Sequence, residues 1–168
     1  LIYYLIGLII CFVVGTIATM LLGLGNEEGV EESKTAIFSS KEVVQLPISG
    51  KVIKLENVKD DVFSTGLMGQ GVAVIPDDGH LYAPFDGVVT MIFETKHAIG
   101  LTSNQGTELL IHIGMDTVEL NGAPFTAHVK QGDSIKQGDL LVSFDIEEIS
   151  SQGYDITTPM VITNGQER

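Results

Sequence analysis

Two of the four histidines, His97 and His112, lie in one run of the sequence with apolar residues on either side, ETKHAIGLTSNQGTELLIHIGMD (94–116). A neutral imidazole can act as a nucleophile, a general base or a metal ligand. Two facing rings are sufficient for phosphoryl transfer, because one can attack while the other donates a hydrogen bond to the charged phosphoryl oxygens. The pattern alone fits a pair of structural histidines in a sheet equally well, so both interpretations stay open here.

The turn between the two histidines determines whether their rings can face each other. SNQG (103–106) is a hairpin signal. If Asn104 and Gln105 form a two-residue loop, or residues 103–106 a four-residue loop, His97 pairs directly with His112. Directly opposed residues have Cβ atoms about 4.5–5.5 Å apart. A three-residue loop would shift the register by one residue and set the histidines on opposite faces. We predict the directly opposed register.

Three neighbours of the histidines have side chains or backbone groups that could serve the pair. Thr95 precedes His97 by two positions, so in a strand it shares that face and its hydroxyl could bond the ring. Gly114 lets the backbone bend close to the His112 ring, where its carbonyl or amide could select the tautomer. Asp116 could orient a group or attract a basic partner, or it could cap the turn that precedes TVEL.

Metal and cofactor chemistry are not expected from this sequence. Zinc sites usually take three protein ligands plus water, or four, and neither H-x-H nor H-E-x-x-H occurs. The single cysteine, Cys11, excludes an intrachain disulfide. His80 and His128 have no partner pattern and are expected at the solvated surface. The net charge of −13 argues against nucleic acid as a partner.

The elements that must position these residues read as strands. From Val43 onward, short β-branched runs alternate with Gly, Asp, Asn and Pro, which predicts an all-β fold, an antiparallel β-sandwich or barrel-sandwich. LPISGKV (46–52) resembles APFDGVV (83–89), which indicates two related half-motifs. Residues 58–67 and 145–152 are each predicted to form a short helical turn.

The N-terminal part of the chain has a different composition. Residues 1–25 carry no charged side chain and are long enough to cross a bilayer core of roughly 30 Å as one transmembrane α-helix. Residues 26–42 are polar and acidic and read as a flexible linker. Residues 43–168 then suffice for one domain with its own core.

Several stretches together resemble the glucose-type enzyme IIA domains of the bacterial sugar phosphotransferase system. The first is FETKHAIGLTSNQGTELLIHIGMDTVELNG (93–122), and the others are LMGQGVAVIP (67–76), LYAPFDGVV (81–89), VKQGDSIKQGDLLVSFD (129–145) and TPMVITN (158–164). HAIGL and the ending GYDITTPMVITN are similar to the β-glucoside and sucrose branch. In that branch the IIA domain often follows a membrane-spanning IIC domain. The resemblance thus implies that residues 1–25 are the last IIC helix in the plasma membrane and that residues 26–168 are cytoplasmic.

The resemblance also implies a role for each matching residue. His112 matches the phosphorylated histidine, which would react through Nε2, and His97 the histidine that stabilises the phosphoryl group. Thr95 matches the hydroxyl that hydrogen-bonds in the site, and Asp116 matches a position at the docking rim, as does Val118. Gln70 stands where glucose-type domains carry an aspartate, so the role of that carboxylate is not carried over.

The implied activity is that of a phosphotransferase without metal or nucleotide. The phosphocarrier protein HPr would supply the phosphoryl group, and a cysteine of a IIB domain, on the same or another chain, would receive it. That transfer would drive uptake and phosphorylation of a sugar of the β-glucoside, sucrose or trehalose class.

Three other interpretations can be set against the same residues. VKQGDSIKQGDLL is similar to a hairpin of lipoyl and biotin carriers, but the MKM-like tip that such carriers modify is absent. A zinc peptidase on a similar sheet would need H-x-H together with H-x-x-x-D, and H-x-H is absent. A regulatory module whose phosphorylation state other proteins read is compatible with the phosphotransfer role.

Overall fold

Antiparallel strands make up most of the regular structure in the computed structural model, which describes residues 42–165. The predicted membrane helix over residues 1–25 lies outside the described residues, as does the predicted linker over 26–42 apart from Glu42. Within residues 42–165, no helix is long and apolar enough to cross a bilayer.

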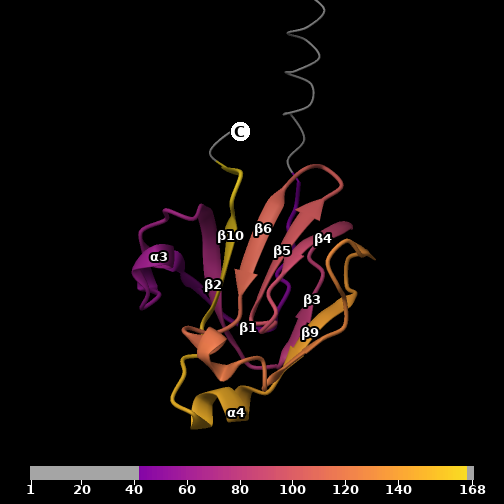
Figure 1. Ribbon diagram of the computed structural model, residues 1–168. Coiled ribbons are helices and arrows are strands. Elements are labelled where there is room, and N and C mark those ends of the chain that lie inside the picture. Colours follow the sequence, from indigo (N-terminus) through magenta and orange to yellow (C-terminus); the bar gives the residue numbers. More distant parts are fainter. Residues whose placement is uncertain (1–41, 166–168) are drawn as a thin grey trace, which may run out of the picture. The chain divides into compact units, whose positions relative to one another are not determined.

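Two antiparallel sheets form the fold (Figure 1). The larger sheet has seven strands, which in spatial order are β1 (Gly50–Lys54), β2 (Gln70–Pro76), β10 (Thr158–Ile162), β6 (Glu108–His112), β5 (Ala98–Ser103), β4 (Gly87–Ile92) and β8 (Ser134–Ile135). The smaller sheet has three, β3 (His80–Tyr82), β9 (Leu140–Phe144) and β7 (Phe125–Ala127). The prediction of an all-β antiparallel sandwich is confirmed.

The two copies of the internal repeat, residues 46–52 and 83–89, each lead into a strand at the same position. In each copy the glycine begins a strand, Gly50 in β1 and Gly87 in β4. The apolar strands that follow the two copies, β2 and β6, both pair with β10, which lies between them.

Within residues 42–165, four short helices interrupt the strands: the 3-10 helices η1 (Leu55–Asn57) and η2 (Thr117–Leu120), and the α-helices α3 (Asp61–Ser64) and α4 (Ile146–Ser151). Both α-helices fall in the predicted helical turns, and each follows an aspartate cap. The Asp60 carboxylate accepts hydrogen bonds from the amides of Val62 and Phe63, at 2.8 and 3.2 Å. The Asp145 carboxylate accepts one from the Glu148 amide at 2.9 Å. Such caps satisfy amides that have no partner within the helix.

Apolar side chains bury the central strands from both sides. The main core combines residues of both sheets, among them Ile99 and Ile111 of the larger and Val142 of the smaller. A second cluster joins Phe63 of α3 to residues that include Met115 and Val161. In β5 five of the six residues are buried. The strands next to both histidines are thus held by packing on each face.

The register of the β5–β6 hairpin differs by one residue from our prediction. Ala98, not His97, pairs with His112, and Thr102 pairs with Glu108. The hairpin loop contains the three residues 104–106, because Gly106 adopts a φ of 86°. A glycine in this left-handed conformation is typical of three-residue hairpin loops.

Ser103 stabilises this loop through its hydroxyl. Its Oγ accepts hydrogen bonds from the amides of Gln105 and Thr107, at 3.1 and 3.0 Å. The same hydroxyl donates to the carboxylate of Glu42 at 2.7 Å. The predicted loop length of two or four residues is therefore wrong. With the observed register, the alternation of side chains along the strands would by itself place the two histidine rings on opposite faces.

Candidate functional site

The two histidine rings nevertheless meet, because His97 lies in a turn and not in a strand. Residues 93–97 connect β4 to β5, and the turn is closed by a hydrogen bond from the Lys96 amide to the Phe93 carbonyl at 2.8 Å. Lys96 has a φ of 58°, so the chain leaves extended geometry just before His97 and alternation does not govern that side chain. The ring centroids of His97 and His112 lie 4.7 Å apart, with an interplanar angle of 76°.

His112, the last residue of β6, has one ring nitrogen held by the backbone. Its Nδ1 lies 2.7 Å from the carbonyl oxygen of Gly114. A carbonyl only accepts, so Nδ1 carries the proton and the neutral ring keeps its lone pair on Nε2. Gly114 can make this contact because it has a φ of 74°, in a space where a Cβ atom would come within 2.5 Å of the Thr117 side chain. The Gly114 carbonyl thus lies where it can select the tautomer of His112.

His97 is held by a side chain instead. It is only 4% exposed, and its Nδ1 lies 2.6 Å from the Thr95 hydroxyl oxygen. Gly122, with a φ of 84°, packs against the backbone of Thr95. When the hydroxyl donates to Nδ1, the neutral ring carries its proton on Nε2. The structure therefore brings Thr95, His97, His112 and Gly114 together as the sequence suggested.

Burial keeps both imidazoles neutral at physiological pH. It lowers the pKa of His97 to about 4, and the neighbouring His112 adds to this effect. Burial also lowers the pKa of His112, although the Gly114 carbonyl and the carboxylates of Asp60 and Asp116 act in the opposite direction. A neutral ring is the form that can attack an electrophile.

A hollow of about 380 Å³ opens next to His112. Most of its lining is apolar, and two carboxylates, Asp60 and Asp116, stand among these side chains. Aromatic rings lie beside both histidines: the Phe63 ring is centred 5.5 Å from that of His112, and the Phe93 ring 5.3 Å from that of His97. The other lining residues are Val62, Met68, Met91, Ala98, Leu110, Met115 and Val118.

Asp116 lies at this hollow and does not cap the turn that follows it. It is exposed, has a φ of 58° and directly precedes η2. Its carboxylate accepts no hydrogen bond from the amides that begin this helix. The alternative role as a cap is therefore wrong. Its carboxylate instead acts on His112, where its negative charge opposes the lowering of the imidazole pKa by burial.

Sequence reasoning did not identify Asp60, Phe63 or Phe93 as part of the site. Asp60 and Phe63 belong to the turn that begins α3, far from His112 in the sequence. The helical turn predicted over residues 58–67 did not indicate that these side chains would lie near His112. Phe93 could have been predicted from the sequence, because it lies four positions before His97 at the start of the same turn.

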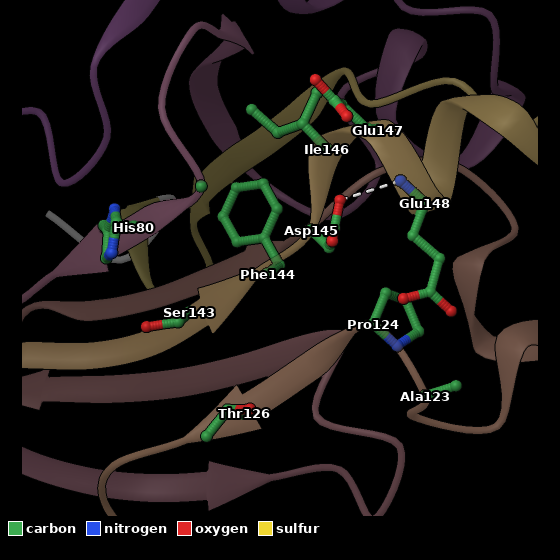
Figure 2. Close-up of a pocket in the computed structure, with 11 residues that line it drawn as sticks. His80, Ala123, Pro124, Thr126, Ser143, Phe144, Asp145, Ile146, Glu147 and Glu148 are labelled. Atoms are coloured by element: carbon green, nitrogen blue, oxygen red, sulfur yellow. Dashed lines mark hydrogen bonds between the residues drawn. The ribbon is translucent and has the colours of Figure 1, made fainter.

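A second hollow, of about 530 Å³, shares no lining residue with the first (Figure 2). It lies between β3, β9 and the start of α4, and three of its lining residues are carboxylates, Asp145, Glu147 and Glu148. Figure 2 shows the Asp145 carboxylate engaged by the Glu148 amide. This concentration of negative charge would repel a phosphoryl group.

The two remaining histidines lie away from the pair. His80 lines the second hollow, where its Nδ1 contacts Asp78 and its ring stacks on Tyr82. His128 is exposed, and its Nε2 lies 2.8 Å from the Ser143 hydroxyl. Among residues 42–165, no group of three or more His, Cys, Asp or Glu side chains is arranged to hold a metal ion.

Comparison with known families gives one match over most of the chain. Residues 42–168 match the model of the phosphoenolpyruvate-dependent sugar phosphotransferase system, EIIA 1. Among solved structures, the fold is similar to glucose permease IIA from Mycoplasma capricolum, with a TM-score of 0.73 and 36% identity over 78% of this chain and 86% of that one.

Curated relatives are similar in sequence and much longer. The chain is 51% identical, over 97% of its length, to the β-glucoside-specific EIIBCA component of Bacillus subtilis (strain 168), of which it covers 27%. It is 54% identical, over 72% of its length, to the β-glucoside-specific EIIBCA component of Dickeya chrysanthemi, of which it covers 19%. The chain thus spans about a quarter or less of these relatives.

Proposed function

The chain belongs to the EIIA 1 family of the phosphoenolpyruvate-dependent sugar phosphotransferase system and contains its phosphotransfer domain, and we propose that His112 carries the phosphoryl group, assisted by His97. The observation that supports this assignment most directly is the hydrogen bond from His112 Nδ1 to the Gly114 carbonyl at 2.7 Å. It leaves the lone pair on Nε2, in a ring that contacts a second imidazole.

The transfer step forms one P–N bond and breaks another. The lone pair of His112 Nε2 attacks the phosphorus atom of a donor phosphohistidine, and the donor imidazole leaves with the electron pair of its own P–N bond. Nδ1 of His112 keeps its proton throughout, because that proton is engaged by the Gly114 carbonyl. No metal has to activate the donor, since a phosphoramidate is already a reactive phosphoryl compound.

His97 would stabilise the phosphoryl group by a hydrogen bond. With the Thr95 hydroxyl donating to Nδ1, the His97 Nε2–H is available to a phosphoryl oxygen. Donors that are fixed before the reaction stabilise developing charge without having to reorganise. Thr95 therefore acts through His97, and its hydroxyl keeps the assisting proton on the correct nitrogen.

The surface around the pair fits partners that are apolar at the contact and basic at its edge. Met68, Phe93 and Val118 line the hollow with exposed fractions of 37, 43 and 47%. Asp60 and Asp116 line it as well. Apolar anchors with complementary charge at the rim are the usual pattern of transient docking. The phosphocarrier HPr is the proposed donor, and a IIB cysteine the proposed acceptor.

We place the chain at the end of a fused permease. Residues 1–25 would be the last helix of a IIC domain in the plasma membrane, and residues 26–168 would lie in the cytoplasm with the IIB domain. The names of the curated relatives favour a β-glucoside as the sugar. Uptake of a β-glucoside, sucrose and trehalose by cells with the complete permease, carrying His112 or His112→Ala, would identify the sugar and the dependence on this histidine.

The central assignment is tested by incubating the chain with phosphorylated HPr. Wild type should take up acid-labile phosphate and His112→Ala none. His97→Ala should still accept phosphate, at a rate reduced by about 10-fold or more. The matched control is His128→Ala, which removes an exposed imidazole outside the hollow and should behave as wild type. Uptake of acid-labile phosphate by His112→Ala would refute the assignment.

A further inference from the structure

One peptide group, between Gly114 and Met115, makes two hydrogen bonds in line. Its carbonyl accepts from His112 Nδ1 at 2.7 Å, and its amide donates to the Asp155 carbonyl at 2.7 Å. Hydrogen bonds in series polarise one another, so an amide that donates well makes the carbonyl of the same peptide a better acceptor. The group that sets the tautomer of His112 is itself held from the opposite side, by residue 155.

The backbone of Asp155 is held in turn by its own side chain. The Asp155 carboxylate accepts a hydrogen bond from the Thr157 amide at 2.8 Å and another from the Thr157 hydroxyl at 2.6 Å, both at the same oxygen, Oδ1. This is an Asx-turn, in which the side chain of one residue fixes the backbone two positions on. Thr157 is only 6% exposed, directly before β10. The turn therefore ties residue 155 to the central sheet.

Other groups do not account for this arrangement. Thr117 holds the preceding carbonyl, that of Ile113, at 2.6 Å, and leaves the Met115 amide to Asp155. The carboxylates that act on the His112 charge are those of Asp60 and Asp116. Asp155 thus reaches His112 through hydrogen bonds and backbone position.

We propose that Asp155 is a positioning residue for His112. Its turn with Thr157 holds the Asp155 carbonyl against the Met115 amide. This contact keeps the Gly114 carbonyl hydrogen-bonded to Nδ1 of His112, so that Nε2 of the same ring keeps its lone pair. The consequence for phosphoryl transfer rests on the proposed function of His112. The consequence for the His112 tautomer does not, and it can be measured in the unphosphorylated chain.

Two substitutions at position 155 separate the hydrogen bonds from the charge. Asp155→Ala removes both acceptor contacts with Thr157. Asp155→Asn removes the charge and keeps an Oδ1 acceptor in the same place. The first readout is the tautomer of His112 by ¹⁵N NMR of the full chain at a pH above the imidazole titration. The second is the rate of phosphate uptake from phosphorylated HPr.

We expect the Nδ1–H tautomer to dominate in wild type and in Asp155→Asn. In Asp155→Ala the Nε2–H tautomer should become detectable, and uptake should slow about threefold to tenfold, which is at or below the roughly 10- to 100-fold effect of removing a direct partner of a metal-ligating histidine, because Asp155 acts one peptide group away. An unchanged tautomer in Asp155→Ala, or an Asp155→Asn variant as impaired as Asp155→Ala, would overturn the proposal. If the tautomer shifts as expected while wild type takes up no phosphate, the proposed function fails and the positioning role stands.

A third variant covers the case in which Asp155→Ala does not fold. Thr157→Val has nearly the same shape, keeps the amide donor and removes the hydroxyl donor to Asp155. It should shift the tautomer of His112 in the same direction by a smaller amount. A folded Thr157→Val chain with the wild-type tautomer and the wild-type rate would count against the proposal.

Discussion

The imidazoles of His97 and His112 lie edge to face with centroids 4.7 Å apart, although the strand register pairs Ala98 with His112. The contact exists because His97 ends the connection formed by residues 93–97, in which the preceding residue, Lys96, has a φ of 58°. The assisting ring is thus positioned by a turn, and the reacting ring by the end of a strand and the glycine after it. The following predictions test these separate supports.

The left-handed conformation at Lys96 should control how the rings meet. Lys96→Gly removes the side chain from a conformation that costs a non-glycine residue roughly 1–2 kcal/mol, so stability should rise slightly and phosphate uptake should persist. Lys96→Val places a β-branched residue there, which should destabilise the chain and slow uptake. Denaturant unfolding and uptake rates measured on both variants check this. Equal stability of the two would contradict it.

Thr95 should act through its hydroxyl alone. Thr95→Val removes the group that lies 2.6 Å from His97 Nδ1, which leaves the tautomer of that ring unselected. We expect uptake of phosphate to fall by about 10-fold, as for loss of other partners of functional histidines. Thr95→Ser keeps the hydroxyl and should stay within about twofold of wild type by the same reasoning. If valine and serine variants transfer at the same rate, the hydroxyl has no such role.

Gly114 should not tolerate a side chain. In Gly114→Ala the new Cβ would lie 2.5 Å from the Thr117 Cγ2 atom and 3.0 Å from the Asp155 carbonyl oxygen. We expect a loss of about 2–4 kcal/mol in the free energy of unfolding, from the clash and the positive φ together, with slower phosphate uptake. Gly132→Ala is the control, since Gly132 has a φ of 89° and nothing within 4 Å. It should lose only about 1 kcal/mol and transfer normally.

Burial of His97 should make the stability of the chain fall in mild acid. Its pKa is lowered to about 4 in the folded chain from an ordinary value of 6.5. Between these values the unfolded chain holds a proton that the folded chain does not, so the free energy of unfolding decreases as the pH falls from 6.5, and the loss is complete below about pH 4. One pKa unit corresponds to about 1.4 kcal/mol, so the loss from His97 is of the order of 3 kcal/mol.

His97→Asn removes this group and should flatten the profile over the same range. A residual slope is expected in that variant, because the pKa of His112 is also lowered. Denaturant unfolding at a series of pH values between 7 and 4 measures both effects. A profile that is the same in wild type and in His97→Asn would show that the imidazole is not buried in the way described.

Features that depend on neighbours in the sequence were predictable. The alternation of apolar runs and turn residues predicted antiparallel strands, and Asp60 and Asp145 begin helices where helical turns were expected. Thr95 and Gly114 each lie two positions from the histidine that they hold. Contacts of this kind are set by local backbone geometry, so spacing alone indicates them.

The hairpin loop shows where local reasoning was not sufficient. SNQG was correctly identified as a turn, but the number of loop residues depended on which residue takes the left-handed conformation. Gly106 takes it, and the loop has three residues. The directly opposed register followed from the wrong choice, and it led to the correct pair of residues only because the turn at Lys96 redirects His97.

The sequence by itself determined which groups are available: two imidazoles, a hydroxyl and a glycine at the right spacing, in a chain of β-strands. The tertiary structure alone decided how they meet and what surrounds them. The Phe63 ring of α3 lies 5.5 Å from the His112 ring, the Asp60 carboxylate acts on the same imidazole, and the Asp155 carbonyl reaches the Met115 amide from the segment before β10. Such contacts join segments far apart along the chain, and their partners depend on how the whole core packs, which no local pattern of residues specifies.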